Sequence, residues 1–259
     1  MEGAKTVDGA FYIKETIACP GKLLPELRDK IKQELLALNW VTKRTARHEY
    51  FMSDTQLTYS YGNKGEEAEL QAKRAAWYEA NMHNGMTPDE RTEAAKLQFP
   101  ASVYTSKPFS PSVRRMMDNL NELYGTDFTA CFLNKYDDQH QHLGWHADEF
   151  EGMRGDQPIA IVSLGAEREI WVKSKRGFKC DLCKGLGKFE DGIKCYPCAG
   201  SGWRPGPPNA RQPDDQRIKL EEGSLFIMPP GYQSTHLHRI PKHDRPCGWR
   251  ISLTFRSFV

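Results

Sequence analysis

Hydrophobic and polar residues follow two different patterns along the chain, and the change falls near residue 128. Upstream of it, leucine and isoleucine recur every three or four residues across positions 24–38, which is the period of an amphipathic helix. The Ala-, Glu- and Lys-rich stretch at 66–82 predicts a second, solvated helix, and the capping sequence that begins at Thr87 predicts a third. A fourth is predicted over 110–125, because Pro follows its first residue and Gly ends it.

Downstream of this point, apolar residues gather in short runs that are rich in β-branched and aromatic side chains and are separated by turn residues. The runs are 128–136, 159–164, 170–172, 224–228 and 251–255. Several short strands at this spacing favour a sandwich, barrel or jelly roll over a parallel sheet. We therefore expect an α+β protein with a helical N-terminal half and a β-rich C-terminal half.

The composition limits the classes of protein that fit this pattern. A length of 259 residues suits one large domain or two small ones and excludes a lone zinc finger. The net charge of +2 excludes a histone-like mode of nucleic-acid binding. The apolar runs fall short of the roughly twenty residues of a membrane-spanning helix, and the N-terminus lacks the apolar core of a signal peptide. We expect an intracellular protein that is neither bound to a membrane nor secreted.

The seven cysteines are more than a chain in a reducing compartment ordinarily carries. Four of them form two CxxCxGxG repeats: Cys180, Cys183, Cys195 and Cys198. Two CxxC pairs separated by eleven residues fit one structural zinc site of four thiolates, whereas a redox pair, the alternative, needs a single CxxC. The repeats resemble those of DnaJ-type chaperones, but two copies instead of four disfavour a chaperone. Prolines and glycines follow, so residues 176–215 are predicted to be a small module inserted in a larger domain.

Basic residues surround the cysteine repeats, and the sequence leaves open whether they contact phosphate or only keep the module solvated. They are Lys173, Lys175, Arg176, Lys179, Lys184, Lys188, Lys194, Arg204 and Arg211. A second candidate phosphate contact is formed by Lys242, His243 and Arg245.

His146 and Asp148 form an HxD pair, and residues two apart on an extended segment point to the same side. His238, just before the final β-type run, is the candidate third donor, and His236 competes with it. Two imidazoles and one carboxylate make the facial triad of non-haem Fe(II) oxygenases, which leaves positions open for a 2-oxoacid and dioxygen. Because HxD pairs also occur in solvated loops, two further features carry the hypothesis.

Those features are a pair of arginines and an Asn-x-Tyr pair. Arg250 and Arg256 lie six residues apart on the last run, and this even offset places both guanidinium groups on one face of a strand. A guanidinium pairs bidentately with a carboxylate. Asn134 and Tyr136, two residues apart, can hydrogen-bond a ligand carboxylate over the same face. An amphipathic strand with two solvated arginines is the alternative.

Together, Asn134-x-Tyr136, His146-x-Asp148, His238 and Arg250-x5-Arg256 resemble the AlkB family of Fe(II)/2-oxoglutarate-dependent dioxygenases. The resemblance covers residues 44–62 and 104–259 without the module. It implies a double-stranded β-helix, or jelly roll, in which the two histidines and the aspartate bind Fe(II). It also implies that Arg250 holds the distal carboxylate of 2-oxoglutarate, and that Asn134, Tyr136 and Arg256 complete the cosubstrate pocket. The implied reaction yields succinate and CO2 and hydroxylates a C–H bond, so that an N-methyl group leaves as formaldehyde.

The segment from residue 47 to residue 62 resembles the nucleotide-recognition lid of the DNA-repair members of that family. In those proteins an aromatic residue near the position of Tyr61 stacks on the flipped base. We therefore assign Arg47, Tyr59, Tyr61 and Glu149 to substrate binding, while tyrosines that only pack a hairpin are the alternative.

The sequence departs from the family in two places. Two acidic residues usually follow the HxD pair, whereas here Glu149 is followed by Phe150. A helical insertion at residues 63–103 also has no counterpart in the family's lid, which leaves the substrate less defined than the cosubstrate.

The expected organisation has three parts: N-terminal helices and lid at 1–103, the dioxygenase core at 104–259, and the zinc module at 176–215 within it. The expected cofactors are Fe(II), 2-oxoglutarate and structural Zn(II). The leading hypothesis is a monomeric enzyme that demethylates alkylated bases of nucleic acid, with DNA favoured. A related oxygenase acting on a modified pyrimidine, a protein or a small molecule stays open. A non-catalytic nucleic-acid binder is disfavoured, because it would need neither the triad nor the two arginines.

Overall fold

The structure, a computed structural model, divides the chain into two compact units. One unit comprises residues 1–54 and 108–259, and the other comprises residues 55–107. The described residues are 5–7, 9–13, 25–42, 47–60, 64–99, 103–150, 152–204 and 216–259. The units do not coincide with the expected boundary at residue 103, because strands from the first 54 residues pair with strands from the C-terminal half.

The first unit contains an eight-stranded antiparallel sheet. Its strand order is β1 (Lys5–Val7), β2 (Ala10–Ile13), β14 (Leu225–Met228), β9 (Ile159–Gly165), β16 (Arg250–Arg256), β7 (Ala130–Tyr136), β4 (His48–Ser53) and β3 (Val41–Thr42). The N-terminal strands lie at the two sides of this sheet, and the C-terminal β16 lies inside it between β9 and β7. The N-terminal half therefore contains strands of the large sheet in addition to its predicted helices.

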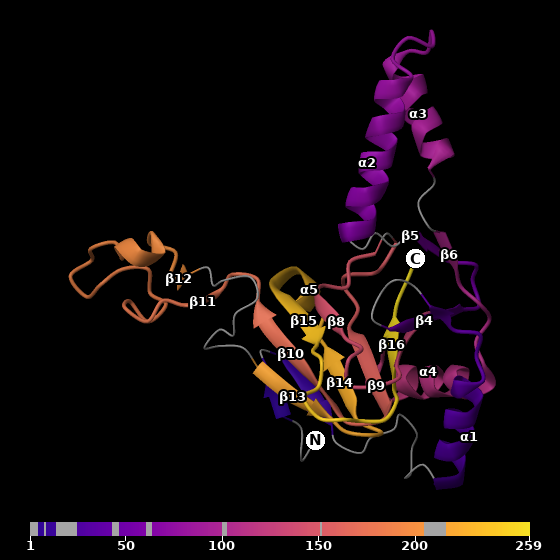
Figure 1. Ribbon diagram of the computed structural model, residues 1–259. Helices are drawn as coiled ribbons and strands as arrows, with labels where there is room; N and C mark the ends of the chain where they lie inside the picture. Colours follow the sequence, from indigo (N-terminus) through magenta and orange to yellow (C-terminus); the bar gives the residue numbers. More distant parts are fainter. Residues whose placement is uncertain are drawn as a thin grey trace. The chain divides into compact units, whose positions relative to one another are not determined.

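Two helices cover one face of the large sheet (Figure 1). They are α1 (Pro25–Leu36) and α4 (Pro111–Tyr124), which confirm the helices predicted over 24–38 and 110–125. Helix α4 ends at Gly125, whose left-handed φ of 62° suits a residue without a side chain. Its buried Met116 and Leu120 join Leu253 of β16 in one apolar cluster, so alternation along β16 directs its odd-numbered residues toward the helices.

A four-stranded antiparallel sheet packs against the opposite face of the large one (Figure 1). Its order is β13 (Gln216–Leu220), β10 (Arg168–Ser174), β15 (His236–Ile240) and β8 (Leu143–His146), and the short helix α5 (Tyr232–Thr235) leads into β15. Ile161 and Phe226 of the large sheet share a second apolar cluster with Ile170, Val172 and Ile240 of the small one. The arrangement of antiparallel sheets with helices is the expected α+β class.

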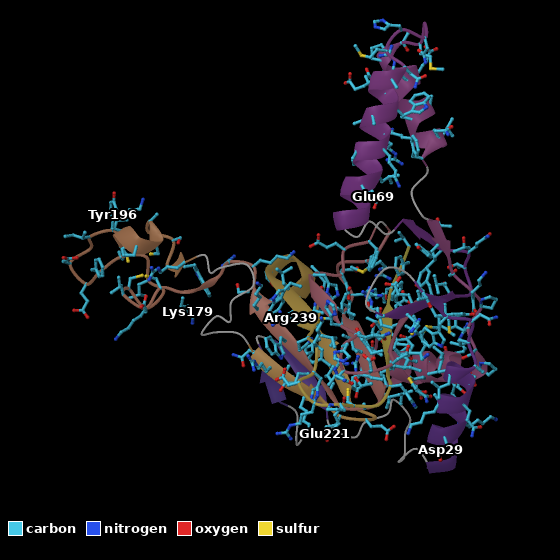
Figure 2. All side chains as sticks on the ribbon, viewed as in Figure 1. Asp29, Glu69, Lys179, Tyr196, Glu221 and Arg239 are labelled. Atoms are coloured by element: carbon cyan, nitrogen blue, oxygen red, sulfur yellow. The ribbon has the colours of Figure 1, made fainter. Side chains whose placement is uncertain are left out.

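The predicted module begins after β10. A short ribbon of β11 (Phe178–Lys179) and β12 (Trp203–Arg204) closes it, and a 3₁₀ turn, η1 (Tyr196–Cys198), lies at the second cysteine pair. The buried cluster among its described residues consists of the four cysteines of the repeats. Several large apolar residues are instead exposed, and Tyr196 projects from the module with 94% of its surface accessible (Figure 2).

The second unit is a helical hairpin inserted in a β-ribbon. Strand β5 (Thr58–Ser60) pairs with β6 (Val103–Thr105), and α2 (Lys64–Ala80) and α3 (Pro88–Gln98) lie between them in sequence and contact each other. The predicted cap at Thr87 is a full capping box with Glu90. Among the described residues of the chain, no helix combines the length and the apolar character needed to cross a membrane.

Candidate metal centres

Three predicted ligand residues meet at one end of the small sheet. His146 of β8 and His238 of β15 are cross-strand partners, so their side chains leave the sheet on the same face with ring centroids 4.2 Å apart. Asp148 follows β8 directly, and its carboxylate oxygens lie 3.5 Å from His146 Nε2 and 4.0 Å from His238 Nε2. These distances are longer than ordinary hydrogen bonds, and they suit ligand atoms that converge on one metal ion. The ligand atoms all lie within 4.8 Å of one another.

The protonation states of this cluster also suit a divalent cation. The Nδ1 of His146 donates to the carbonyl of Gly144 over 2.9 Å, which leaves the Nε2 lone pair for a metal. Burial lowers the pKa of His238 to about 3, and neighbouring His146 adds to the effect, so the imidazole is neutral. Burial alone would raise the pKa of Asp148, but Arg256 and the two histidines outweigh it and hold it well below its usual value. A neutral imidazole and an ionised carboxylate are the donors that a metal requires.

His236, the competing candidate, does not join the cluster. It pairs with Ser174 of β10, whereas His238 pairs across to His146. Its ring stacks on Tyr232 with centroids 4.2 Å apart, and its Nδ1 lies 2.8 Å from Thr235 Oγ1. The sequence left open whether His236 or His238 is the third metal ligand, and the pairing register of β15 selects His238.

Arg250, Tyr136 and Asn134 lie on the large sheet, on the face that meets the small sheet. Arg250 is the cross-strand partner of Tyr136, and Ser252 is the partner of Asn134. The Arg250 guanidinium is completely buried, donates from Nη2 to Ser163 Oγ over 2.9 Å, and lies 5.5 Å from the Tyr136 ring. The even offset along β16 thus places both arginines on the face of the large sheet that meets the small sheet.

This side of the site carries unmet hydrogen-bonding capacity. The Tyr136 hydroxyl and the Nε and Nη1 atoms of Arg250 are buried without a hydrogen-bond partner among the described residues. Burial lowers the pKa of Arg250 to about 10 against the opposing effect of Tyr136. A buried, unsatisfied donor costs about 1–3 kcal/mol, more when charged. A carboxylate bound here would satisfy these groups, so the residues fit a small dicarboxylate such as 2-oxoglutarate.

Arg256 lies nearer the metal ligands than the sequence suggested. Its Nη2 lies 2.8 Å from Asp148 Oδ2, and its guanidinium stacks over Phe150 and Phe132 at 5.0 and 5.6 Å from the ring centroids. Phe150 stands where the family has a second acid, and it stacks on Phe132. The aromatic residue therefore covers the Arg256–Asp148 ion pair, while Glu149 is largely exposed and pairs with Lys175 over 2.8 Å.

The remaining residues assigned to substrate binding lie in different places. Arg47 is buried, donates from Nε to Asn134 Oδ1 over 2.7 Å and pairs with Glu49 over 2.6 Å. This position favours a role in orienting Asn134 over contact with a base. Tyr59 lies on β5 in the second unit, and Tyr61 falls outside the described residues. Base stacking by the two tyrosines stays a prediction.

Two residues of the site were missed by the sequence analysis. Glu49 is the cross-strand partner of Asn134, and its two-residue spacing from Arg47 was an available signal. Arg168 is fully buried and donates hydrogen bonds to the carbonyls of Asp138 and Gln141. These two hydrogen bonds hold the loop before β8 in place. An arginine among apolar β residues carries no sign of this role in sequence alone.

The four cysteines form the second candidate metal centre. The Sγ atoms of Cys180 and Cys195 are 3.8 Å apart, and those of Cys183 and Cys198 are 3.7 Å apart. A tetrahedral ion with Zn–S bonds of about 2.3 Å requires S–S distances of about 3.8 Å, whereas a disulfide needs about 2.05 Å. The cluster therefore has the spacing of metal ligands.

The two repeats around the cysteines have matching backbone structure. Gly185 donates to the carbonyl of Cys180, and Gly200 donates in the same way to Cys195. Each repeat also accepts from the other, because Cys195 N donates to Gly187 O and Cys180 N donates to Gly202 O, both over 2.8 Å. The repeat seen in the sequence is thus a pair of interlocked turns around the four sulfur atoms.

The chain is similar to several known proteins. The family described as the 2OG-Fe(II) oxygenase superfamily matches residues 37–256. DNA oxidative demethylase ALKBH2 of Arabidopsis thaliana is 32% identical over 180 residues, which are 66% of this chain and 53% of that protein. ALKBH2 of Mus musculus is 28% identical over 161 residues, or 62% of this chain and 56% of that protein. The chain spans about half the length of the curated relatives it matches.

Two further matches are more distant. Alpha-ketoglutarate-dependent dioxygenase alkB homolog 3 of Homo sapiens is 24% identical over 165 residues, or 62% of this chain and 49% of that protein. A solved structure titled "The structure of OsALKBH1" covers 98% of this chain and 99% of its own at 14% identity, with a TM-score of 0.46.

Proposed function

This chain belongs to the 2OG-Fe(II) oxygenase superfamily as an AlkB-like member, and on that premise we propose that it is a 2-oxoglutarate-dependent dioxygenase that demethylates alkylated bases of nucleic acid, with DNA as the favoured substrate. The observation that carries the proposal is the pairing of two sites between the sheets. One side presents the His146, Asp148 and His238 donors, and the other presents the buried, unsatisfied groups of Arg250 and Tyr136.

His146, Asp148 and His238 would hold Fe(II), because two imidazoles and one carboxylate leave three positions of an octahedral ion open. Arg250 would pair with the distal carboxylate of 2-oxoglutarate, with the Tyr136 hydroxyl donating to the same carboxylate. The chemistry supplied at this site when iron is bound would be oxidation by dioxygen, in which one oxygen atom enters 2-oxoglutarate as it decarboxylates to succinate and CO2, and the other hydroxylates a C–H bond of the substrate. An N-hydroxymethyl base then releases formaldehyde and leaves the unmodified base.

Other residues of the chain keep this machinery in place. Arg256 neutralises and anchors Asp148, and Phe150 shields that ion pair from water. Gly144 sets the tautomer of His146. Arg47, supported by Glu49, orients the Asn134 amide from the neighbouring strand. Loss of such supporting contacts in metal sites typically lowers activity by about 10- to 100-fold.

Two structural assignments accompany the proposed activity. The facing eight- and four-stranded sheets are the two layers of a double-stranded β-helix, since both are antiparallel and enclose the candidate site between them. The four cysteines bind a structural zinc ion, because a closed set of four thiolates leaves no position for a substrate.

A cavity of about 630 Å³ beside Asp148 offers room for a base. Its walls include Phe150, Met153, Ile159 and Gln233, and the side chain of Gln233 accepts a hydrogen bond from Asp148 N over 2.9 Å. A flipped base needs such a largely apolar slot next to the reacting centre. The similarity to the DNA oxidative demethylases ALKBH2 of Arabidopsis thaliana and Mus musculus supports DNA as the polymer.

The enzymatic proposal is tested by succinate formation from 2-oxoglutarate in the presence of Fe(II). We expect His146→Ala and Asp148→Ala to reduce turnover to background, while His140→Ala, an exposed histidine in the preceding loop, leaves turnover unchanged. Arg250→Ala should raise the KM for 2-oxoglutarate by about 30-fold or more, as loss of a buried charge pair costs at least about 2 kcal/mol. Turnover that survives both metal-ligand variants would show the iron assignment to be wrong.

The substrate is tested by mass spectrometry of oligonucleotides that carry 1-methyladenine, 3-methylcytosine or 5-methylcytosine, in single and double strands. Loss of one methylene mass identifies demethylation of an N-methylated base. Gain of one oxygen mass on 5-methylcytosine would instead identify hydroxylation of a modified pyrimidine. If no oligonucleotide changes mass while succinate is formed, the chain is an oxygenase of another substrate class.

A further inference from the structure

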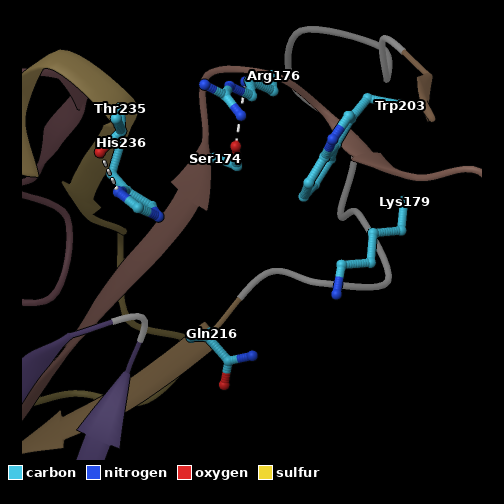
Figure 3. A pocket seen from close by; sticks show the side chains of 7 residues that line it. All are labelled: Ser174, Arg176, Lys179, Trp203, Gln216, Thr235 and His236. Carbon is cyan, nitrogen blue, oxygen red and sulfur yellow. Dashed lines mark hydrogen bonds between the residues drawn. The ribbon is translucent and has the colours of Figure 1, made fainter. Parts of the chain in front are cut away.

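A cavity of about 540 Å³ opens where the cysteine module joins the small sheet (Figure 3). Ser174, Gln216 and His236 line it from the ends of β10, β13 and β15, and Lys179 and Trp203 line it from the ribbon of the module. Its volume lies within the range of about 300–1,000 Å³ that is usual for small-molecule sites. None of these residues belongs to the candidate iron site.

The cavity continues the sheet face that carries the metal ligands. His236 and His238 are two residues apart on β15, so both side chains leave the strand on one side, about 6.6 Å apart along it. The cross-strand partners of the two histidines are Ser174 and Val172, and Val172 lies in the core between the sheets. A polymer with one unit at the metal centre would therefore reach this cavity with a neighbouring unit.

The chemistry of the walls suits a nucleotide. Arg176 and Lys179 supply positive charge, and none of the described residues that line the cavity is acidic. Arg176 makes no ion pair with any described residue, and its backbone N–H donates to Ser174 Oγ over 3.1 Å, which fixes its place beside the cavity (Figure 3). By contrast, the cavity of about 300 Å³ beside Arg168 is lined by both Glu167 and Glu169.

Trp203 adds a surface for stacking. Its indole is half-buried, and Figure 3 shows the ring facing the cavity across from His236. Stacking of a base on an aromatic ring tolerates any sequence, because every base has a π face. Sites for single-stranded nucleic acid combine cations, which contact the phosphates, with a flat aromatic ring, on which a base stacks.

We propose that this cavity binds the nucleotide that flanks the target base, with Trp203 stacking on that base and Arg176 and Lys179 contacting its phosphate. The inference rests on the proposed function, because it assumes that the substrate is a nucleic-acid strand. It assigns the cysteine module a part in substrate binding: the module builds one wall of a subsite next to the catalytic cluster.

The cysteine cluster sets the position of that wall. Lys179 and Trp203 are paired residues of the β11–β12 ribbon, and each is adjacent in sequence to the cluster or its glycines. The hydrogen bond from Cys180 N to Gly202 O locks the ribbon directly beside them. Zinc binding at the four cysteines thus orients an indole and an ammonium group without touching the ligand.

The test is the affinity of the zinc-loaded 259-residue chain for a labelled single-stranded oligonucleotide with one N-methylated base, measured by fluorescence anisotropy without 2-oxoglutarate. Trp203→Ala should weaken binding by about five- to 100-fold, and Trp203→Phe should restore most of it. Arg176→Ala should weaken binding and reduce the salt slope by about one phosphate contact. In turnover, KM for the oligonucleotide should rise, whereas 2-oxoglutarate consumption without oligonucleotide stays unchanged.

Tyr196→Ala is the matched control, because Tyr196 is an exposed aromatic residue of the same module that does not line the cavity. Zinc content is measured for every variant, and Arg176→Ala, outside the cysteine repeats, decides the outcome if Trp203→Ala loses its zinc. Wild-type protein that demethylates the oligonucleotide while both variants bind and react normally overturns the inference and leaves the proposed function intact. Wild-type protein that neither binds nor modifies any oligonucleotide overturns both.

Discussion

The paired sheets and the cysteine module bury different kinds of side chain. Outside the candidate site, the buried core of the sheets is mostly aliphatic and aromatic, and Leu253, Phe255 and Phe226 are completely inaccessible. In the module the buried cluster consists of four cysteines, while Leu186 and Tyr196 are 74% and 94% exposed. The sheets gain stability from apolar burial over a long chain. The described part of the module buries no apolar core of this kind, and the proposed zinc ion would stabilise it instead.

Close approach of the backbone requires glycine in both regions. In the module, Gly187 has a φ of 74°, and a β-carbon there would lie 2.3 Å from the carbonyl oxygen of Gly200. The interlocked turns therefore require residues without side chains, since the backbones touch. In the sheets, side-chain volume fills the space between layers. A comparable close approach occurs there at Gly165, the last residue of β9, where a β-carbon would lie 2.4 Å from the carbonyl oxygen of Trp249.

The largest effect is expected from removal of the proposed zinc ion. Chelation, or Cys180→Ser, should unfold residues 178–204 and leave the sheets folded, because structural zinc supplies about 10–16 kcal/mol to such modules. Hydrogen exchange by mass spectrometry should show lost protection in the module alone, with zinc falling from one ion per chain to none. Cys247→Ser, outside the cluster, is the control. If the sheets lose protection at the same chelator concentration, the two regions are not independent.

A smaller effect is expected from a cavity in the sheets. Leu253→Ala removes a completely buried side chain and should lower the free energy of unfolding of the sheets by about 2–5 kcal/mol, with zinc content unchanged. Ile193→Ala, an exposed residue of the module, should change it by less than about 0.5 kcal/mol. Urea unfolding followed by circular dichroism measures both. Equal losses would mean that the module has an apolar core after all.

A third test separates close backbone contact from backbone strain within the module. In Gly187→Ala the new residue would have a positive φ, and its β-carbon would also clash with the carbonyl of Gly200. In Gly192→Ala the φ of 81° is equally unfavourable, but no atom lies within 4 Å of the new β-carbon. We expect Gly187→Ala to cost about 1–3 kcal/mol, and Gly192→Ala to cost less, in zinc affinity measured by competition with a chelator. A larger loss for Gly192→Ala would contradict the interlocked turns.

The smallest effect concerns a charge at the margin of the sheets. Burial would raise the pKa of Asp137, but hydrogen bonds from Lys135 and His48 lower it below its usual value. A lowered carboxyl pKa stabilises the fold above the unfolded pKa, and this contribution disappears as the pH falls through the folded pKa. Since the side chain is partly exposed, Asp137→Asn should remove about 0.5 kcal/mol at pH 7 and less at pH 2. Urea unfolding at the two pH values measures it, and an equal loss at both would refute the electrostatic origin.

The sequence predicted those parts of the site whose geometry is local. Residues two or six apart on a strand share a face, which places His146 with Asp148 and Arg250 with Arg256. The helices α1 and α4 followed from apolar spacing and capping residues. Strand β4 was missed because the polar residue Glu49 faces the interior at the site, where the hydrophobic pattern misleads.

Contacts between distant segments were decided by the tertiary structure. Strand register selects His238 over His236, brings Arg47 to Asn134, and directs Arg256 to Asp148. Ring packing places Phe150 over that ion pair, and the joint between module and sheet creates the cavity at Trp203. The sequence by itself determined the donor types and their spacing, since these depend on neighbours along the chain. Which donors meet depends on hydrogen-bond register between strands up to about a hundred residues apart, and only the folded chain sets that register.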